Sequence, residues 1–162
     1  MPAAYRARIE QSRPRMEQMA REIYGVEMNP GPFGVDSRPA LVGGKFAEAQ
    51  GRGAAYHARM MRAYWDEAQK IDDPAVLAQL AAEVGLDAHA FNAALQDPAY
   101  IGQVDADIAL AAQYGLTGVP ALIFDSKYLV SGAQPADALR RIIDQVAARR
   151  DAPPPPESQN TL

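Results

Sequence analysis

The chain has 162 residues, 48% of them hydrophobic, which is enough for one compact domain with a core and too few for two domains of ordinary size. Its formal net charge is -4, with 16 Lys and Arg among 20 Asp and Glu, so no basic face is expected and we expect no nucleic-acid partner. The absence of cysteine excludes disulfides, thiolate nucleophiles and cysteine-ligated metal sites in this chain.

The N-terminal segment carries Arg6, Arg8 and Glu10 and has no apolar run of signal-peptide length. No segment approaches the roughly 18 to 20 consecutive apolar residues of a membrane helix. We therefore expect no membrane partner and a cytoplasmic location.

Ser12, followed by Pro14, predicts a helix that starts with a serine cap and runs to about Tyr24. Its apolar stripe has helical spacing and consists of Met16, Met19, Ala20 and Ile23. The breaker-rich segment 28–36 predicts a loop. Ser37 and Pro39 then repeat the start signal for a second helix, which ends at the glycines after residue 50 and is weakened by Gly43 and Gly44.

A third helix is predicted from about Ala54 to Gln69. We expect one buried face made of aromatic residues and methionines, namely Tyr56, Met60, Met61, Tyr64 and Trp65. This face favours core packing over an apolar ligand pocket.

Three aspartates open the next helices. Asp73 precedes Pro74 in a fourth helix that ends at Gly85, Asp87 caps a short fifth helix, and Asp97 precedes a longer sixth helix. The sixth helix ends at Gly115 and carries an apolar stripe of Ile101, Val104, Ile108 and Ala111.

After Gly118 the pattern changes to short β-prone runs at 121–124 and 128–130, which predict an antiparallel hairpin. Pro135 leads into a final amphipathic helix with Leu139, Ile142, Ile143 and Val146 at helical spacing. The tail 151–162 contains four consecutive prolines and is expected to be extended and disordered.

Gly118, Val119 and Pro120 are followed by a predicted strand, a turn, a second strand, residues 131–135 and a helix. This order of elements resembles the C-terminal half of a DsbA-like thioredoxin domain. Stretches 37–40 and 85–87 resemble the FrnE-like group and the related 2-hydroxychromene-2-carboxylate isomerases, and the likeness spans about 12–148. The resemblance implies a mainly helical α+β chain, a partial thioredoxin-like domain over 1–150. Its parts are a helical insertion (12–115), then the cis-proline, hairpin and final helix (118–149).

In that family the proline matching Pro120 follows a cis peptide bond and faces the redox cysteines. The main chain of the residue before it pairs with a substrate peptide. The resemblance therefore implies substrate-binding roles for Gly118, Val119 and Pro120, with no catalytic residue, metal or cofactor in this chain. The family's Cys-x-x-Cys half is lacking, so we expect an oxidoreductase by descent that is redox-inactive, through natural truncation, a misplaced start codon or a frameshift.

Two alternatives stay open. In one, the chain is a non-redox module that binds a peptide or protein partner by strand addition at the cis-proline edge. In the other, it is a glutathione-dependent isomerase of an aromatic substrate, although it lacks the N-terminal serine region of those relatives.

Other reactive side chains favour ordinary structural roles. His57 and His89 fall on different helices among solvent-facing residues and are expected on the surface. No Ser–His–Asp motif is present, because Ser12 and Ser37 are expected to cap helices and Ser131 belongs to a turn. Two pairs of neighbouring aspartates are not expected to bind a metal ion. Asp105 and Asp107 point to different sides of a helix, and Asp72 and Asp73 are expected to cap one.

The strand 121–124 is apolar and uncharged, and without the family's preceding strand it has an open edge. We expect this edge to pair with a second copy, which would bring Leu122 and Phe124 of two chains together in a homodimer. An extended segment around Met1 to Tyr5 is the alternative partner.

Overall fold

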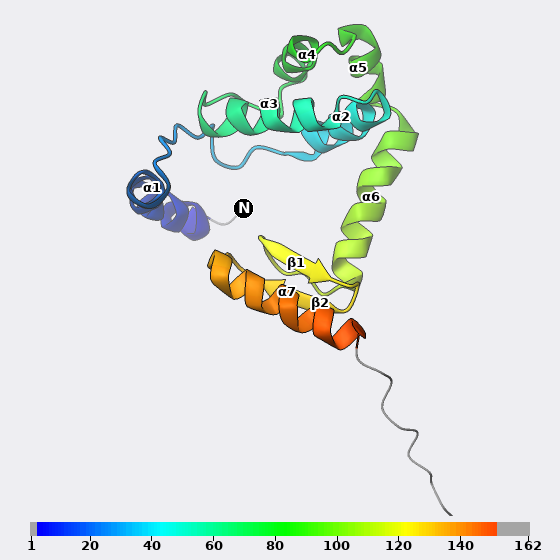
Figure 1. The fold of residues 1–162 in the computed structure, drawn as a ribbon. Coiled ribbons are helices and arrows are strands. Elements are labelled where there is room, and N and C mark those ends of the chain that lie inside the picture. Colours follow the sequence, from blue (N-terminus) through cyan, green and yellow to red (C-terminus); the bar gives the residue numbers. More distant parts are fainter. Residues whose placement is uncertain (1–2, 152–162) are drawn as a thin grey trace, which may run out of the picture. The chain divides into compact units, whose positions relative to one another are not determined.

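The computed structural model describes residues 3–151. In chain order its elements are α1 (Ala3–Tyr24), α2 (Arg38–Ala49), α3 (Gly53–Trp65), α4 (Pro74–Glu83), α5 (Ala88–Ala94), α6 (Pro98–Gln113), β1 (Ala121–Phe124), β2 (Tyr128–Ser131) and α7 (Ala136–Asp151) (Figure 1). The described part is thus mainly helical with one two-stranded sheet, as predicted. None of its helices is long and apolar enough to cross a membrane. The predicted disordered tail lies outside the described residues, except for Asp151, which ends α7.

The chain divides into two compact units, Met1–Ile108 and Ala109–Leu162, and each is described by itself. The division falls inside α6. The boundaries predicted at 115–118 from the sequence stay a prediction.

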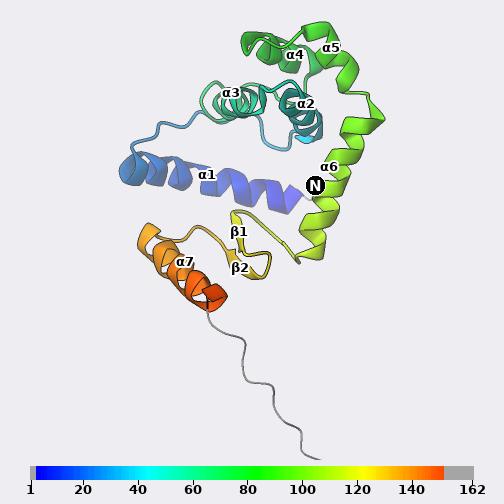
Figure 2. The same ribbon diagram turned by 45° about the vertical axis from the view of Figure 1, so that its right-hand side comes forward.

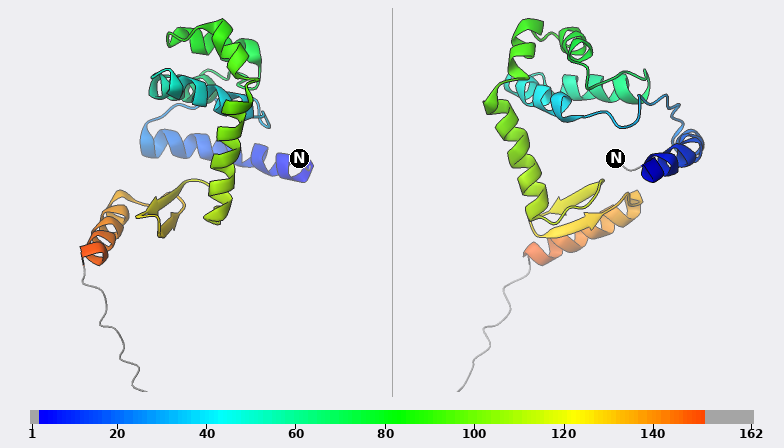
Figure 3. Two further views of the ribbon diagram at one scale, coloured as in Figure 1. Left: turned by 90° about the vertical axis from the view of Figure 1, so that its right-hand side faces the viewer. Right: turned by 180° about the vertical axis from the view of Figure 1, so that it is seen from behind.

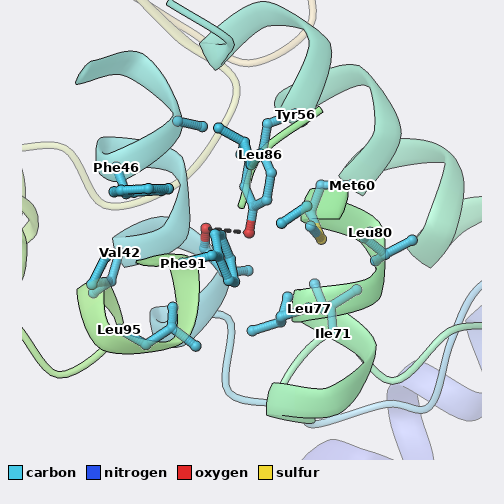
Figure 4. Close-up of a cluster of buried hydrophobic side chains, with 14 of the residues drawn as sticks. Val42, Phe46, Tyr56, Met60, Ile71, Leu77, Leu80, Leu86, Phe91 and Leu95 are labelled. Carbon is cyan, nitrogen blue, oxygen red and sulfur yellow. Dashed lines mark hydrogen bonds between the residues drawn. The ribbon is translucent and has the colours of Figure 1, made fainter. Parts of the chain in front are cut away.

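The core of the first unit lies among α2, α3, α4 and α5 (Figure 2). Its largest fully buried side chains are Phe91, Leu77 and Leu80. The ring of Phe91 meets that of Phe46 edge-on, with 6.0 Å between their centroids, and lies 5.7 Å from that of Tyr56. Figure 4 shows these side chains converging from separate helices. Aromatic pairs at such distances add to the stability gained by apolar burial.

The predicted aspartate caps are confirmed. A carboxylate oxygen of Asp73 accepts from the Ala75 N–H (2.9 Å). The carboxylates of Asp87 and Asp97 make the equivalent bonds to N–H groups in the first turns of α5 and α6. Each bond satisfies a donor that the first turn of a helix otherwise leaves free.

The predicted serine caps are wrong. The side chain of Ser37 makes no capping bond at α2. A cap accepts from the second or third helical N–H, and the second residue of α2, Pro39, has none. Asp36 accepts instead from the N–H of Arg38, the first residue of α2 (2.9 Å).

The start of the first helix is also corrected. α1 begins at Ala3, so Ser12 and Pro14 lie inside it, and the Ser12 hydroxyl donates to the Ile9 carbonyl (2.9 Å). Residues 3–11 contain no glycine or proline and are rich in strong helix formers, which outweigh the one N–H lost at Pro14. Because residues 3–5 are helical, they are not the extended segment that could have paired with β1; Met1 and Pro2 lie outside the described residues.

The third helix is shorter than predicted, and its apolar residues do not share one face. Tyr56 and Met60 are buried, whereas Met61 and Trp65 are 46% and 37% exposed. Steps of 100° per residue place Trp65 opposite Tyr56 on the helix, which explains the difference. α3 ends at Trp65 because the loop before α2 supplies partners for its last carbonyls: the N–H of Asn29 donates to Trp65 (2.7 Å).

In the second unit, β1 and β2 form an antiparallel hairpin. Its turn is closed by a bond from the Lys127 N–H to the Phe124 carbonyl (3.1 Å), with positive φ at Asp125 and Ser126. The helix α7 lies along one face of the hairpin (Figure 3), and the guanidinium of Arg149 lies 5.7 Å from the centroid of the Tyr128 ring.

Candidate functional site

The candidate site is the segment that leads from α6 into β1, together with the end of β2. These parts line a pocket of about 170 Å³, which we name the Pro120 site. Its lining residues are Leu116, Thr117, Gly118, Val119, Pro120, Ser131 and Gly132. All of them belong to the second unit.

Main-chain geometry builds this site. The Val119–Pro120 peptide bond is cis, as the resemblance carried by Gly118, Val119 and Pro120 implied. The N–H of Gly132 donates to the Pro120 carbonyl (2.8 Å), so these two residues face each other just beyond the strands. Pro120 has no N–H to give to the sheet and is tolerated at the position where β1 begins.

The residues that follow β2 form the other side of the site. Gly132 has φ +80°, a conformation that side chains disfavour, and it turns the chain toward α7. The side-chain amide of Gln134 donates to the Ser131 carbonyl (3.0 Å). This main-chain acceptor at the outer edge of β2 therefore already has a hydrogen-bond donor.

The main chain of Val119 is the exposed feature of the site. Its side chain is 94% exposed, and neither its N–H nor its carbonyl has a hydrogen-bond partner within residues 3–151. An N–H and a carbonyl that are both open can bind another extended chain as a strand does.

The lining carries no charged side chain and only two hydroxyls, those of Thr117 and Ser131. It therefore offers no general acid or base and no set of metal ligands. What it can supply is main-chain hydrogen bonding beside apolar surface.

The structure brings together Gly118, Val119 and Pro120, the residues predicted from the sequence. It adds Leu116, Thr117, Ser131 and Gly132, which were not predicted as site residues. Leu116 and Thr117 directly precede Gly118, and this adjacency was the available signal for them. Ser131 and Gly132 enter only through the strand pairing, because the pairing of 121 with 131 places the end of β2 beside Pro120.

The remaining candidates belong to the first unit and are not among the residues that line this site. His57 and His89 are exposed on α3 and α5, as predicted. Asp105 pairs with Arg38, and a carboxylate oxygen of Asp107 lies 2.7 Å from the Lys45 ammonium. The same contact raises the pKa of Lys45. Residues 3–151 contain no cluster of His, Asp and Glu that could hold a metal ion.

Comparisons with known proteins place the chain among its relatives. The family model described as the DSBA-like thioredoxin domain matches residues 2–144. The uncharacterized protein YwbO of Bacillus subtilis (strain 168) is 32% identical over 133 residues, which make up 80% of this chain and 64% of YwbO. The chain thus spans somewhat less than two thirds of that relative's length.

Two solved structures are similar. A probable DsbA oxidoreductase, SCO1869 of Streptomyces coelicolor, superposes with a TM-score of 0.77 at 28% identity, covering 93% of this chain and 67% of that one. A 2-hydroxychromene-2-carboxylate isomerase gives 0.73 at 20% identity, covering 93% and 73%, and this likeness concerns the fold alone.

Proposed function

The chain belongs to the DsbA-like thioredoxin domain family, and on that premise we propose that its Pro120 site holds an extended peptide by main-chain hydrogen bonds. In this proposal the protein is an FrnE-like thiol-disulfide oxidoreductase by descent. The chain itself contributes substrate binding and no redox step, because it has no cysteine. The observation that carries the proposal is the unpaired main chain of Val119 beside an open, uncharged pocket.

The size of the pocket favours a peptide over a small aromatic substrate. Sites for small molecules typically enclose roughly 300 to 1,000 Å³ and contain precisely placed polar groups. The Pro120 site measures about 170 Å³ and is lined by no charged group. An extended peptide needs only a strand edge with open main-chain hydrogen-bonding groups, and space for every second one of its side chains. This supports peptide binding over the isomerase alternative.

A titration followed by NMR tests the proposal. The full chain, labelled with ¹⁵N, is titrated with an unstructured peptide that carries one S-carboxymethylated cysteine. We expect saturable shifts of the Gly118 and Val119 amides, because the peptide bonds to the Val119 N–H and carbonyl. Shifts confined to residues outside the Pro120 site would contradict the proposal.

Two variants at one position separate the main chain from the side chain. Val119→Pro removes the N–H donor and should weaken peptide binding by about tenfold, the equivalent of about 1.4 kcal/mol. Val119→Ala keeps the N–H and should bind as the wild type does. Equal affinity of all three proteins would show that the peptide does not use this edge.

The cytoplasmic location is part of the proposal and is tested by cell fractionation.

A further inference from the structure

The outer edge of β1 is open, and the register shows which of its groups point outward. In an antiparallel pair, directly opposed residues alternate between bonded and non-bonded pairs. Because Gly132 bonds to Pro120, Leu122 and Val130 form the next bonded pair. The N–H and carbonyl groups of Ala121 and Ile123 therefore point away from β2. Within the described residues the sheet contains only β1 and β2, so no third strand covers these groups.

A groove lies at the turn end of β1. It has a volume of about 450 Å³ and lies between the end of β1 and α7. Its lining residues are Phe124, Asp125, Ile143, Val146, Ala147 and Arg150. Leu122 lies on the same face of β1 as Phe124, since side chains two residues apart share a face, and it is 39% exposed. The open edge therefore continues into apolar surface on the side of α7.

The two edges of the hairpin differ. At the outer edge of β2, the Ser131 carbonyl is already bonded by the side chain of Gln134 (3.0 Å). The outer edge of β1 carries only alanine, leucine, isoleucine and phenylalanine, with none of the charges or bulges that protect edge strands from pairing. The edge of β1 is thus the one open to another strand.

We propose that this edge pairs with β1 of a second copy of the chain about a twofold axis at Leu122. The outward groups of Ala121 and Ile123 lie symmetrically on either side of Leu122. An antiparallel partner therefore places Ala121 opposite Ile123 of the partner subunit, and Ile123 opposite Ala121 of the partner subunit. Each of these outward groups then has a hydrogen-bond partner.

The side chains fit this arrangement. The two copies of Leu122 form a non-bonded pair, in which side chains lie closest, on the face that carries the groove. The pairing thus covers Leu122 and the rim of the groove at Phe124. It ends where the turn begins, because positive φ at Asp125 takes the chain out of the strand. Val119 is then left unpaired, so the dimer uses main-chain groups other than those of the proposed peptide site.

Two proline variants test the edge. Ala121→Pro removes an outward N–H of β1 without touching the bonds between β1 and β2. Ser131→Pro is the matched control, because Ser131 is opposite Ala121 and its N–H points to the outer edge of β2. Light scattering of the full chain at about 50 µM should give twice the 17.5 kDa chain mass for the wild type and for Ser131→Pro, and the single mass for Ala121→Pro.

A wild type of 17.5 kDa at that concentration overturns the proposal, and so does an Ala121→Pro variant that stays dimeric. If Ala121→Pro fails to fold by circular dichroism, hydrogen exchange of the wild type decides. Protection of the Ala121 and Ile123 amides that rises with protein concentration supports the dimer. Protection that is independent of concentration, or that requires an added peptide, overturns it.

Discussion

Gly43 lies where three helices meet. A β-carbon built on it would lie 2.5 Å from the ring of Phe91 and 2.6 Å from the hydroxyl of Tyr56. The neighbouring Gly44 has only a Tyr56 ring carbon, 4.0 Å away. The two glycines weaken the intrinsic helicity of α2 equally, but only Gly43 is required for packing of α2 against α3 and α5.

We predict opposite effects of alanine at these two positions. Gly43→Ala should destabilise the protein by about 1 to 3 kcal/mol, because buried rings must move to make room. Gly44→Ala should be neutral or stabilising by up to about 1 kcal/mol, because alanine favours the helix. Urea unfolding measures both free energies, and equal losses would refute the role given to Gly43.

Tyr56 is the buried titratable group of the core. It is 3% exposed, and its hydroxyl donates to the Ala40 carbonyl (3.3 Å), the bond drawn in Figure 4. Burial raises the pKa of Tyr56 well above its ordinary value near 10. The folded state therefore keeps this proton at alkaline pH after the unfolded chain has lost it.

The sign of the pH dependence follows from that difference. The contribution is fully present below the ordinary tyrosine pKa and is lost as the pH rises above it. Between about pH 8 and about pH 11 the wild type should lose about 1 kcal/mol more stability than Tyr56→Phe, which has no such proton. Unfolding curves at both pH values test this, and parallel losses in the two proteins would contradict it.

At the scale of elements, the helix starts differ in what holds them. The carboxylate of Asp87 lies 2.7 Å from the Ala90 N–H at the start of α5. Ser37 occupies the corresponding position of α2 without a side-chain bond. A favourable residue type is therefore a necessary but not a sufficient sign of a cap.

We predict that Asp87→Ala costs about 1 kcal/mol of unfolding free energy, the usual value of a cap, because the first turn of α5 loses its acceptor. Ser37→Ala should cost less than about 0.5 kcal/mol, since it removes no bond. Thermal or urea unfolding measures both. A larger loss for Ser37→Ala than for Asp87→Ala would show that the caps are assigned wrongly.

The apolar stripes show a second difference at this scale. Tyr56 and Met60 are buried, yet Met19 and Ile23 of α1 are 48% and 63% exposed despite their helical spacing. Spacing determines that residues share a face of a helix, whereas burial requires a neighbouring element to cover that face.

At the scale of the whole molecule, the absence of cysteine means that this chain alone cannot carry out thiol–disulfide exchange. We predict that the purified chain does not accelerate the reduction of insulin by dithiothreitol, since no residue can form a mixed disulfide. A DsbA-like protein that contains Cys-x-x-Cys serves as the positive control. Turnover above the background of dithiothreitol would contradict the prediction.

The sequence by itself determined the family, the hairpin, the aspartate-capped helices and the main-chain segment Gly118–Pro120, because these depend on local signals: spacing, turn residues and caps. Tertiary structure alone decided other features. The end of α3 depends on hydrogen bonds from the loop at Asn29. Ser131 and Gly132 join the Pro120 site through the pairing of β1 with β2. Each of these is set by groups distant in the sequence, whose approach no local pattern encodes.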